Sequence, residues 1–160
     1  MKLDNSKTII SSRIKLFAVT VLFLGYIIMS YVAKMFKLTL FGWSDTVWTI
    51  IFAAIWLFIA LLPMLLNHQY VSYSDDDESI VFRYFTSGIV GGKKNSVEID
   101  KKTFAGYKTE KQIMGLSLSI ILYQHFKEGI AQYPPIYITA LSEKERAKIF
   151  NSLNQYSTKT

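Results

Sequence analysis

The sequence of 160 residues contains no cysteine. Disulfide bonds, thiolate metal sites and cysteine nucleophiles are therefore excluded. Histidine is almost as scarce, since only His68 and His125 occur, far apart and without a partnered Cys or Glu motif. Neither stands in a G-x-S-x-G or H-E-x-x-H frame, which would mark a hydrolase or a zinc protease. We accordingly expect no catalytic residue, no metal site and no bound cofactor.

Charge is missing from two long stretches near the N-terminus. Residues 16–33 and 46–66 contain no Asp, Glu, Lys, Arg or His. As helices they would be about 27 Å and about 31 Å long, close to the roughly 30 Å hydrocarbon core of a bilayer. Lys15 and Lys34 bracket the first stretch, where their ammonium groups can reach the lipid headgroups. We predict two transmembrane helices that form an antiparallel hairpin over residues 16–66.

A cleaved signal peptide is the main alternative for the first stretch, because a basic segment precedes it. Its apolar run is longer than a usual signal core, and no small-residue cleavage motif follows it. A soluble helical core is less favoured, since both stretches are apolar on every face. The lack of charge inside them argues against an ion pathway or proton relay formed by this chain alone.

The net charge of +6 is unevenly distributed. Residues 1–66 carry six Lys/Arg and two Asp, and the rest of the chain carries twelve Lys/Arg and ten Asp/Glu. The basic excess therefore flanks the apolar stretches, which disfavours nucleic-acid binding by the remaining domain. The N-terminal basic tail, residues 1–15, has four Lys/Arg, and the loop between the stretches has two. The positive-inside rule then predicts that both termini are cytoplasmic.

Residues 69–156 have the pattern of a β-rich domain. Apolar and polar residues alternate on both sides of an acidic turn at Asp75–Glu78 and again over Met114–Phe126, as expected of half-buried strands. Ser142 and Glu145 have the spacing of a capping box. We predict short strands followed by a C-terminal helix at 143–155 and a tail at 157–160. The expected fold is a small β-barrel or curved sheet that this helix caps.

Two charged clusters are candidates for a binding site. The acidic turn could hold a divalent cation, but it lacks the spacing and glycine of an EF-hand loop, so a solvated hairpin tip is favoured. Four lysines form a candidate surface for anionic lipid headgroups or for a partner: Lys93, Lys94, Lys101 and Lys102. Each lysine close to an anionic membrane contributes about 1 kcal/mol to binding. The competing interpretation is a set of ordinary solvated charges.

The stretch Tyr133–Arg146, with Pro-Pro before a short strand and a Ser-Glu helix start, resembles the end of bacterial membrane proteins with a pleckstrin-homology-like domain, including the YcxB-like group. Residues 70–85 carry the rest of the resemblance. The likeness implies a seven-stranded, helix-capped barrel without catalytic activity. In eukaryotic relatives a basic loop between the first two strands binds phosphoinositides. Here Asp75–Glu78 occupies that place and would repel phosphate.

Two functions are compatible with these features. The favoured one is a non-enzymatic binding, adaptor or regulatory module, anchored in a bacterial inner membrane by two spans, whose β domain recruits a protein or peptide. The alternative is an accessory subunit of a larger transport or envelope complex that acts through its helix hairpin, where Gly25 and Ala53 permit close helix packing. The expected partners are the lipid bilayer and an unidentified protein, with anionic lipid as a further candidate and no nucleic acid.

Overall fold

The computed structural model describes residues 1–34, 42–86 and 92–157 of the chain. It divides into two compact units, one of residues 10–63 and one that combines residues 1–9 with 64–160. Most of the predicted loop between the apolar stretches, and residues 158–160 of the predicted tail, lie outside the described residues.

The first unit is helical. Helix α1 (Ser6–Ile27) continues through the π-helical turn η1 (Ile28–Val32), and α2 spans Asp45–Leu65. Both helices are long and apolar enough to cross a membrane, as the sequence predicts from length and composition. Helix α1 begins ten residues before the predicted span, so most of the N-terminal basic tail, residues 1–15, is helical. Pro63 lies inside α2, near its end.

Polar and aromatic contacts join α1 to α2. The indole Nε1 of Trp56 donates to the hydroxyl of Thr20 over 3.0 Å, and the hydroxyl of Tyr26 hydrogen-bonds with that of Thr49 over 3.2 Å. The rings of Phe23 and Trp56 stack with centroids 5.9 Å apart. The hydroxyls of Thr20 and Thr49 are thus satisfied within the hairpin, as an apolar environment requires, whereas the buried Ser30 hydroxyl has no hydrogen-bond partner among the described residues.

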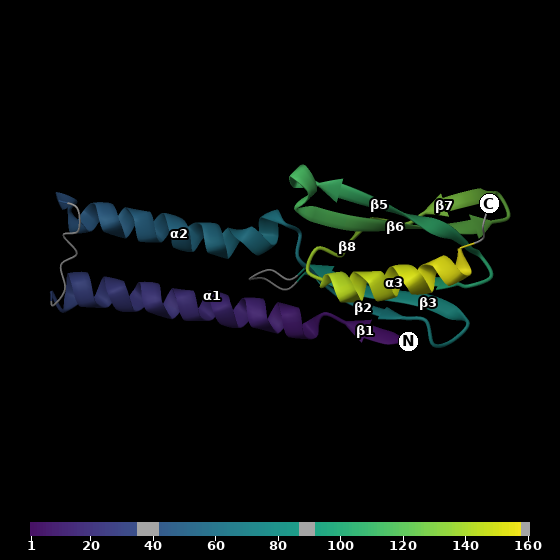
Figure 1. Ribbon diagram of the computed structural model, residues 1–160, viewed down its shortest axis with the longest axis horizontal. Helices are drawn as coiled ribbons and strands as arrows, with labels where there is room; N and C mark the ends of the chain where they lie inside the picture. The colour runs from purple at the N-terminus through teal and green to yellow at the C-terminus, as the bar shows by residue number, and fades with distance from the viewer. Residues whose placement is uncertain (35–41, 87–91, 158–160) are drawn as a thin grey trace. The chain divides into compact units, whose positions relative to one another are not determined.

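The second unit contains a four-stranded antiparallel sheet in the order β1-β2-β3-β4. Strands β2 (Gln69–Ser74), β3 (Ser79–Thr86) and β4 (Asn95–Asp100) form a meander, as the alternating pattern predicts. Strand β1 (Lys2–Asp4) was not predicted. It pairs with β2 so that Leu3 lies opposite Tyr73. The first residues of the chain therefore complete a sheet whose other strands all follow α2 (Figure 1).

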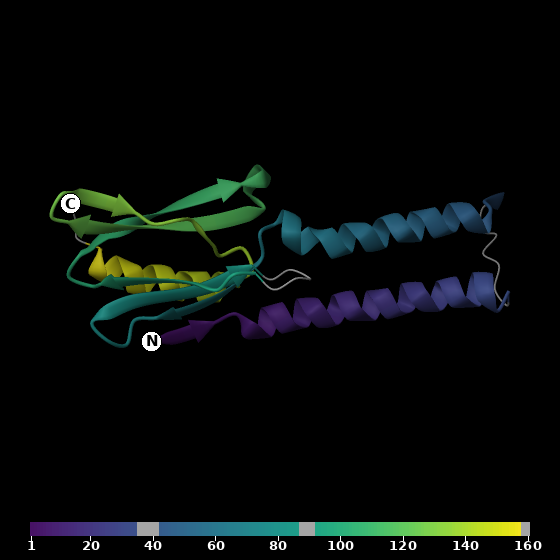
Figure 2. The same ribbon diagram turned by 180° about the vertical axis from the view of Figure 1, so that it is seen from behind.

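A second antiparallel sheet follows. Strands β5 (Phe104–Gln112), β6 (Ser117–Phe126) and β7 (Gly129–Gln132) are neighbours in that order, and β8 (Ile136–Tyr137) also pairs with β6. The predicted strand over 114–126 starts later, because η3 (Ile113–Gly115) is a short helical turn between β5 and β6. Figure 2 shows this long β5–β6 hairpin from behind.

The expected fold was a small β-barrel or a curved sheet; the described strands form two antiparallel sheets and not a closed barrel, so the mainly-β fold is confirmed and the barrel form is corrected. Strands β4 and β5 are consecutive in the chain but belong to different sheets, so the strand ladder is interrupted between them. Helix α3 (Glu143–Tyr156) runs beside the sheets (Figure 1) and has the predicted capping box of Ser142 and Glu145. Its Ile149 and Leu153 enter the common core. The largest fully buried core side chains include Tyr73, Phe82, Phe104, Ile120, Leu122 and Ile138.

Candidate functional site

An open groove lies on the first sheet, at the end where β2 begins. It has a volume of about 390 Å³ and is lined by Tyr70, Arg83, Tyr84, Phe85, Lys94, Asn95 and Ser96. We call it the cationic groove. Alternation places most of these side chains: Val71 and Tyr73 of β2 face the core, so Tyr70 faces outward. The same rule applies to β3. Phe82 and Tyr84 are buried, so the alternate residues Arg83 and Phe85 face outward.

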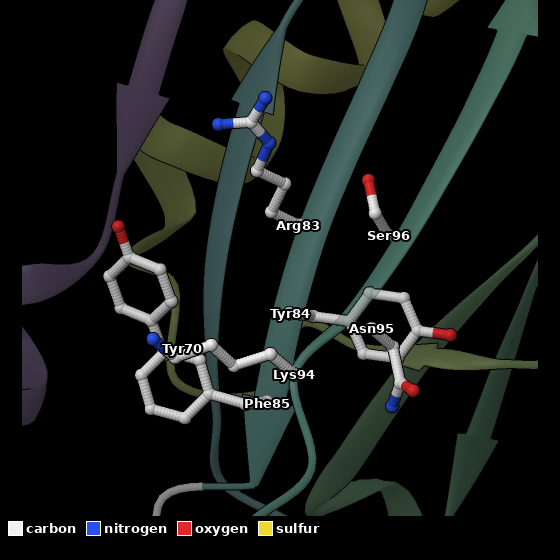
Figure 3. Close-up of a pocket in the computed structure, with 7 residues that line it drawn as sticks. All are labelled: Tyr70, Arg83, Tyr84, Phe85, Lys94, Asn95 and Ser96. Atoms are coloured by element: carbon white, nitrogen blue, oxygen red, sulfur yellow. The ribbon is translucent and has the colours of Figure 1, made fainter.

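An aromatic pair forms one end of the cationic groove. Tyr70 and Phe85 are register partners on β2 and β3, and their rings stack with centroids 4.7 Å apart. In Figure 3 the two rings lie beside each other, and the side chain of Lys94 extends in their direction. A stacked pair of this kind is a rigid apolar surface with little conformational entropy to lose on binding. It can hold the apolar or planar part of a ligand.

The charge of the cationic groove has one sign. Arg83 and Lys94 are its charged residues, and no acidic side chain lines it. Within the part of the chain that the structure describes, neither has an ion-pair partner. A guanidinium presents a planar fork of donors that matches a carboxylate or a phosphate. The arrangement therefore favours a ligand that combines an anionic group with an apolar or aromatic one.

The four predicted lysines do not form one surface. Lys93 and Lys94 precede β4, whereas Lys101 and Lys102 follow it, so a six-residue strand of roughly 20 Å separates the two pairs. Lys94 lines the cationic groove. The ammonium group of Lys101 donates to the carbonyl oxygens of Asp75 and Asp77, over 2.6 Å each, and lies 4.7 Å from the ring centroid of Tyr156. Lys101 therefore stabilises the β2–β3 turn.

The acidic turn is only in part a solvated tip. Asp76, Asp77 and Glu78 are exposed, but Asp75 is buried. Its carboxylate accepts hydrogen bonds from the Met1 ammonium and the Ser152 hydroxyl. Burial acts to raise the pKa of Asp75, but these two donors outweigh burial and hold the pKa below its usual value. The carboxylate therefore joins β2 to α3 and is not free to receive a ligand.

A buried hydroxyl pair completes this connection. The Tyr73 hydroxyl lies 2.7 Å from that of Ser152 and 3.4 Å from a carboxylate oxygen of Asp75. Burial raises the pKa of Tyr73, so the phenol stays protonated. His125 is exposed on β6 and His68 is half-buried before β2, where burial lowers the pKa of its imidazole. The hydrogen bonds among Tyr73, Asp75 and Ser152 thus hold the end of β2 against α3.

The end of the domain at which β2 begins also receives both helices, and we call it the helix-bearing end. The buried side chain of Asn5 donates from Nδ2 to the Gln69 carbonyl and accepts at Oδ1 from the Val71 amide, over 2.9 Å in each case. The Gln69 side chain in turn accepts from the Tyr137 amide over 3.0 Å. These contacts tie the start of α1 to both sheets. The sequence pattern gave no signal for Asn5, which lies in the predicted N-terminal basic tail, ahead of the first predicted span.

Within the described ranges, no group of three His, Asp or Glu side chains could hold a metal ion. No family model, curated protein or solved structure matches the chain. The resemblance to pleckstrin-homology-like proteins therefore stays a prediction.

Proposed function

We propose that this protein is a membrane-anchored, non-enzymatic binding module that presents its β domain at a bilayer surface. The pairing of β1 with β2 carries this proposal. Strand β1 precedes α1 and β2 follows α2, so the two ends of the apolar hairpin meet in one sheet. A hairpin of two spans returns the chain to the side from which it started, as this pairing requires. The four Lys/Arg of residues 1–15, which precede the uncharged stretch of α1, favour the cytoplasmic side of a bacterial inner membrane.

The proposed ligand of the domain is an extended, acidic segment of a partner protein. Strand β4 is the last strand of its sheet, and no described strand pairs with its outer side. An added peptide strand can satisfy such an edge with main-chain hydrogen bonds. The first residues of β4, Asn95 and Ser96, line the cationic groove. A peptide on this edge would therefore bring its side chains to Arg83, Lys94 and the Tyr70–Phe85 pair.

The strand meander followed by a capped C-terminal helix supports a relationship to pleckstrin-homology-like domains, in an open form with two sheets. This relationship concerns ancestry only, and the proposed ligand is inferred from the residues of the cationic groove.

Co-purification of the full chain from its native membrane tests this function. The groove variant carries Arg83→Glu and Lys94→Glu. The control variant carries Lys127→Glu and Lys144→Glu, which change the net charge equally at exposed positions elsewhere. We expect a co-eluting protein, identified by mass spectrometry, that the groove variant loses and the control retains. Recovery of the same proteins with both variants, or of none with the unmodified chain, would contradict the proposal.

An accessory subunit that acts through its helix hairpin is the second candidate. The exposed alkyl and aromatic side chains along α1 and α2 leave surface for other helices. However, Thr20 and Thr49 already hydrogen-bond within the hairpin, and few polar groups are left to join other helices. Fusion of residues 10–63 to an unrelated soluble domain separates the two functions, because only the second candidate predicts that the fusion still assembles with the partner.

A further inference from the structure

The tip of the β5–β6 hairpin exposes three large apolar side chains in succession. Ile113, Met114 and Leu116 are 48%, 103% and 64% exposed, with Gly115 between them. We call these four residues the apolar tip. Hairpin turns of soluble domains are usually built from Gly, Asn, Asp and Pro. The apolar tip has only one such residue and packs none of its large side chains into the domain core.

The backbone of the apolar tip is unusual as well. Ile113, Met114 and Gly115 have φ values of 50°, 55° and 88°. Glycine adopts this left-handed region freely, but a β-branched residue such as Ile113 rarely does. Strained residues of this kind persist where the surrounding fold enforces them, and they concentrate at functional positions. Here the strain accompanies a turn that directs apolar side chains away from the domain.

The apolar tip lies beside the end of α2. Ser117, the residue that follows it, donates its hydroxyl to the carbonyl oxygen of Leu66 over 3.4 Å. Leu66 directly follows the last residue of α2. Met114 is three residues from Ser117, and a chain of three residues reaches at most about 11 Å. Figures 1 and 2 both show η3 at the end of the domain where β2 begins, which is the helix-bearing end.

We propose that the apolar tip inserts into the interfacial layer of the bilayer next to the point where α2 leaves it. This inference rests on the proposed membrane anchorage and adds a third contact with the lipid. The interfacial layer accepts apolar side chains to a depth of roughly 5–10 Å, which is within reach of a turn beside Leu66. Lys111, exposed two residues before the tip, is placed to meet anionic headgroups.

A bilayer fits the apolar tip better than a protein does. Stable protein interfaces bury about 800 Å² on each partner, far more than three side chains on one turn can supply. Contact with lipid needs no such area here, because the helices already hold the domain at the membrane and give the tip a high effective concentration. This contact would restrict rotation of the β domain about the two chain segments that join it to α1 and α2. It would therefore also fix the direction in which the cationic groove opens.

Depth-dependent fluorescence quenching tests the inference. The absence of cysteine from the sequence allows single, labelled cysteines in the full chain. Met114→Cys reports on the tip, and Leu61→Cys reports on α2. Glu128→Cys, in the exposed turn at the far end of the ten-residue β6, is the control at roughly 33 Å along the strand. Each variant carries a polarity-sensitive dye in nanodiscs whose phosphatidylcholine and phosphatidylglycerol chains are brominated near the headgroup or near the chain end.

We expect bromine near the headgroup to quench the dye at Met114→Cys, with little effect at Glu128→Cys, and both brominated lipids to quench the dye at Leu61→Cys, which is about 8 Å along α2 from Leu66. Equal, weak quenching at Met114→Cys and Glu128→Cys, with strong quenching at Leu61→Cys, would overturn the insertion of the tip and leave the membrane anchorage intact. Weak quenching at Leu61→Cys would overturn both. If the labelled Met114→Cys chain shows no lipid quenching, and unlabelled Met114→Cys chains form a disulfide with each other on addition of a mild oxidant, a second copy of the chain would replace the bilayer as the partner of the tip.

Discussion

Replacement of Asn5 by alanine should loosen the β domain at its helix-bearing end. Asn5 is only 1% exposed, and its side chain accepts from the Val71 amide and donates to the Gln69 carbonyl. Asn5→Ala leaves both main-chain groups of β2 without these partners. A buried polar group that loses its partner costs about 1–3 kcal/mol. The two together predict a loss of about 2–6 kcal/mol, a large share of the roughly 5–15 kcal/mol that stabilises a domain.

Hydrogen exchange is the appropriate measurement for this variant. All three tryptophans lie between residues 43 and 56, so intrinsic tryptophan fluorescence does not report directly on the β domain. Mass spectrometry of peptides that cover β1 and β2, in the full chain, does. A loss of 2 kcal/mol corresponds to about 30-fold faster exchange wherever global opening controls the rate. Asn151→Ala, at an exposed position of α3, is the matched control and should leave these peptides unchanged.

A second substitution at the same position tests the orientation of the amide. Asn5→Asp keeps an oxygen for the Val71 amide but places the other oxygen against the Gln69 carbonyl. It should therefore destabilise the domain at least as much as alanine does. Wild-type exchange with either Asn5→Ala or Asn5→Asp would refute the role assigned to this side chain.

Three further outcomes are expected. Ser152→Ala removes the hydroxyl between Asp75 and Tyr73 and should lower the free energy of unfolding by about 1–3 kcal/mol in urea titrations, whereas Asn151→Ala should not. Burial lowers the pKa of His68 from 6.5 in the folded protein, so as the pH falls the unfolded chain binds a proton at His68 before the folded chain does. The free energy of unfolding should therefore decrease as the pH drops below 6.5. The same decrease in a His68→Gln variant would contradict this. Ile113→Asn should raise the melting temperature through relief of about 1 kcal/mol of backbone strain while it weakens tip quenching by brominated lipid, and an unchanged or lower melting temperature would argue against that strain.

The sequence predicts the elements that depend on local pattern. The two apolar stretches, the β2–β3 hairpin and the capping box of Ser142 all follow from residue periodicity or fixed spacing, and the structure has each of them. Strand β1 could not be predicted in this way, because three residues carry no measurable alternation and their partners in β2 are some 70 positions away.

Only some of the residues that line the cationic groove could be predicted from the sequence. Lys94 belonged to the predicted basic surface, and the alternation of β3 indicated that Phe85 shares a face with Arg83. The stacking of Tyr70 on Phe85 depends on the register between β2 and β3. Lys101 was assigned to the same surface as Lys94, although the two lysines lie at opposite ends of β4. The ammonium group of Lys101 already donates hydrogen bonds within the domain, and only the tertiary contacts show this.

The pairing of β1 with β2 has a consequence for biogenesis. During synthesis Lys2–Asp4 is made before the apolar hairpin, and its partner strand β2 is made only after both helices. In a membrane, a chain that inserts only one of its two helices leaves the two strands on opposite sides of the bilayer, and the sheet cannot be completed. The β1–β2 pairing can then form only in a chain whose two helices have both inserted. A wrongly inserted chain exposes the unpaired edge of β2, where quality-control proteases can attack it.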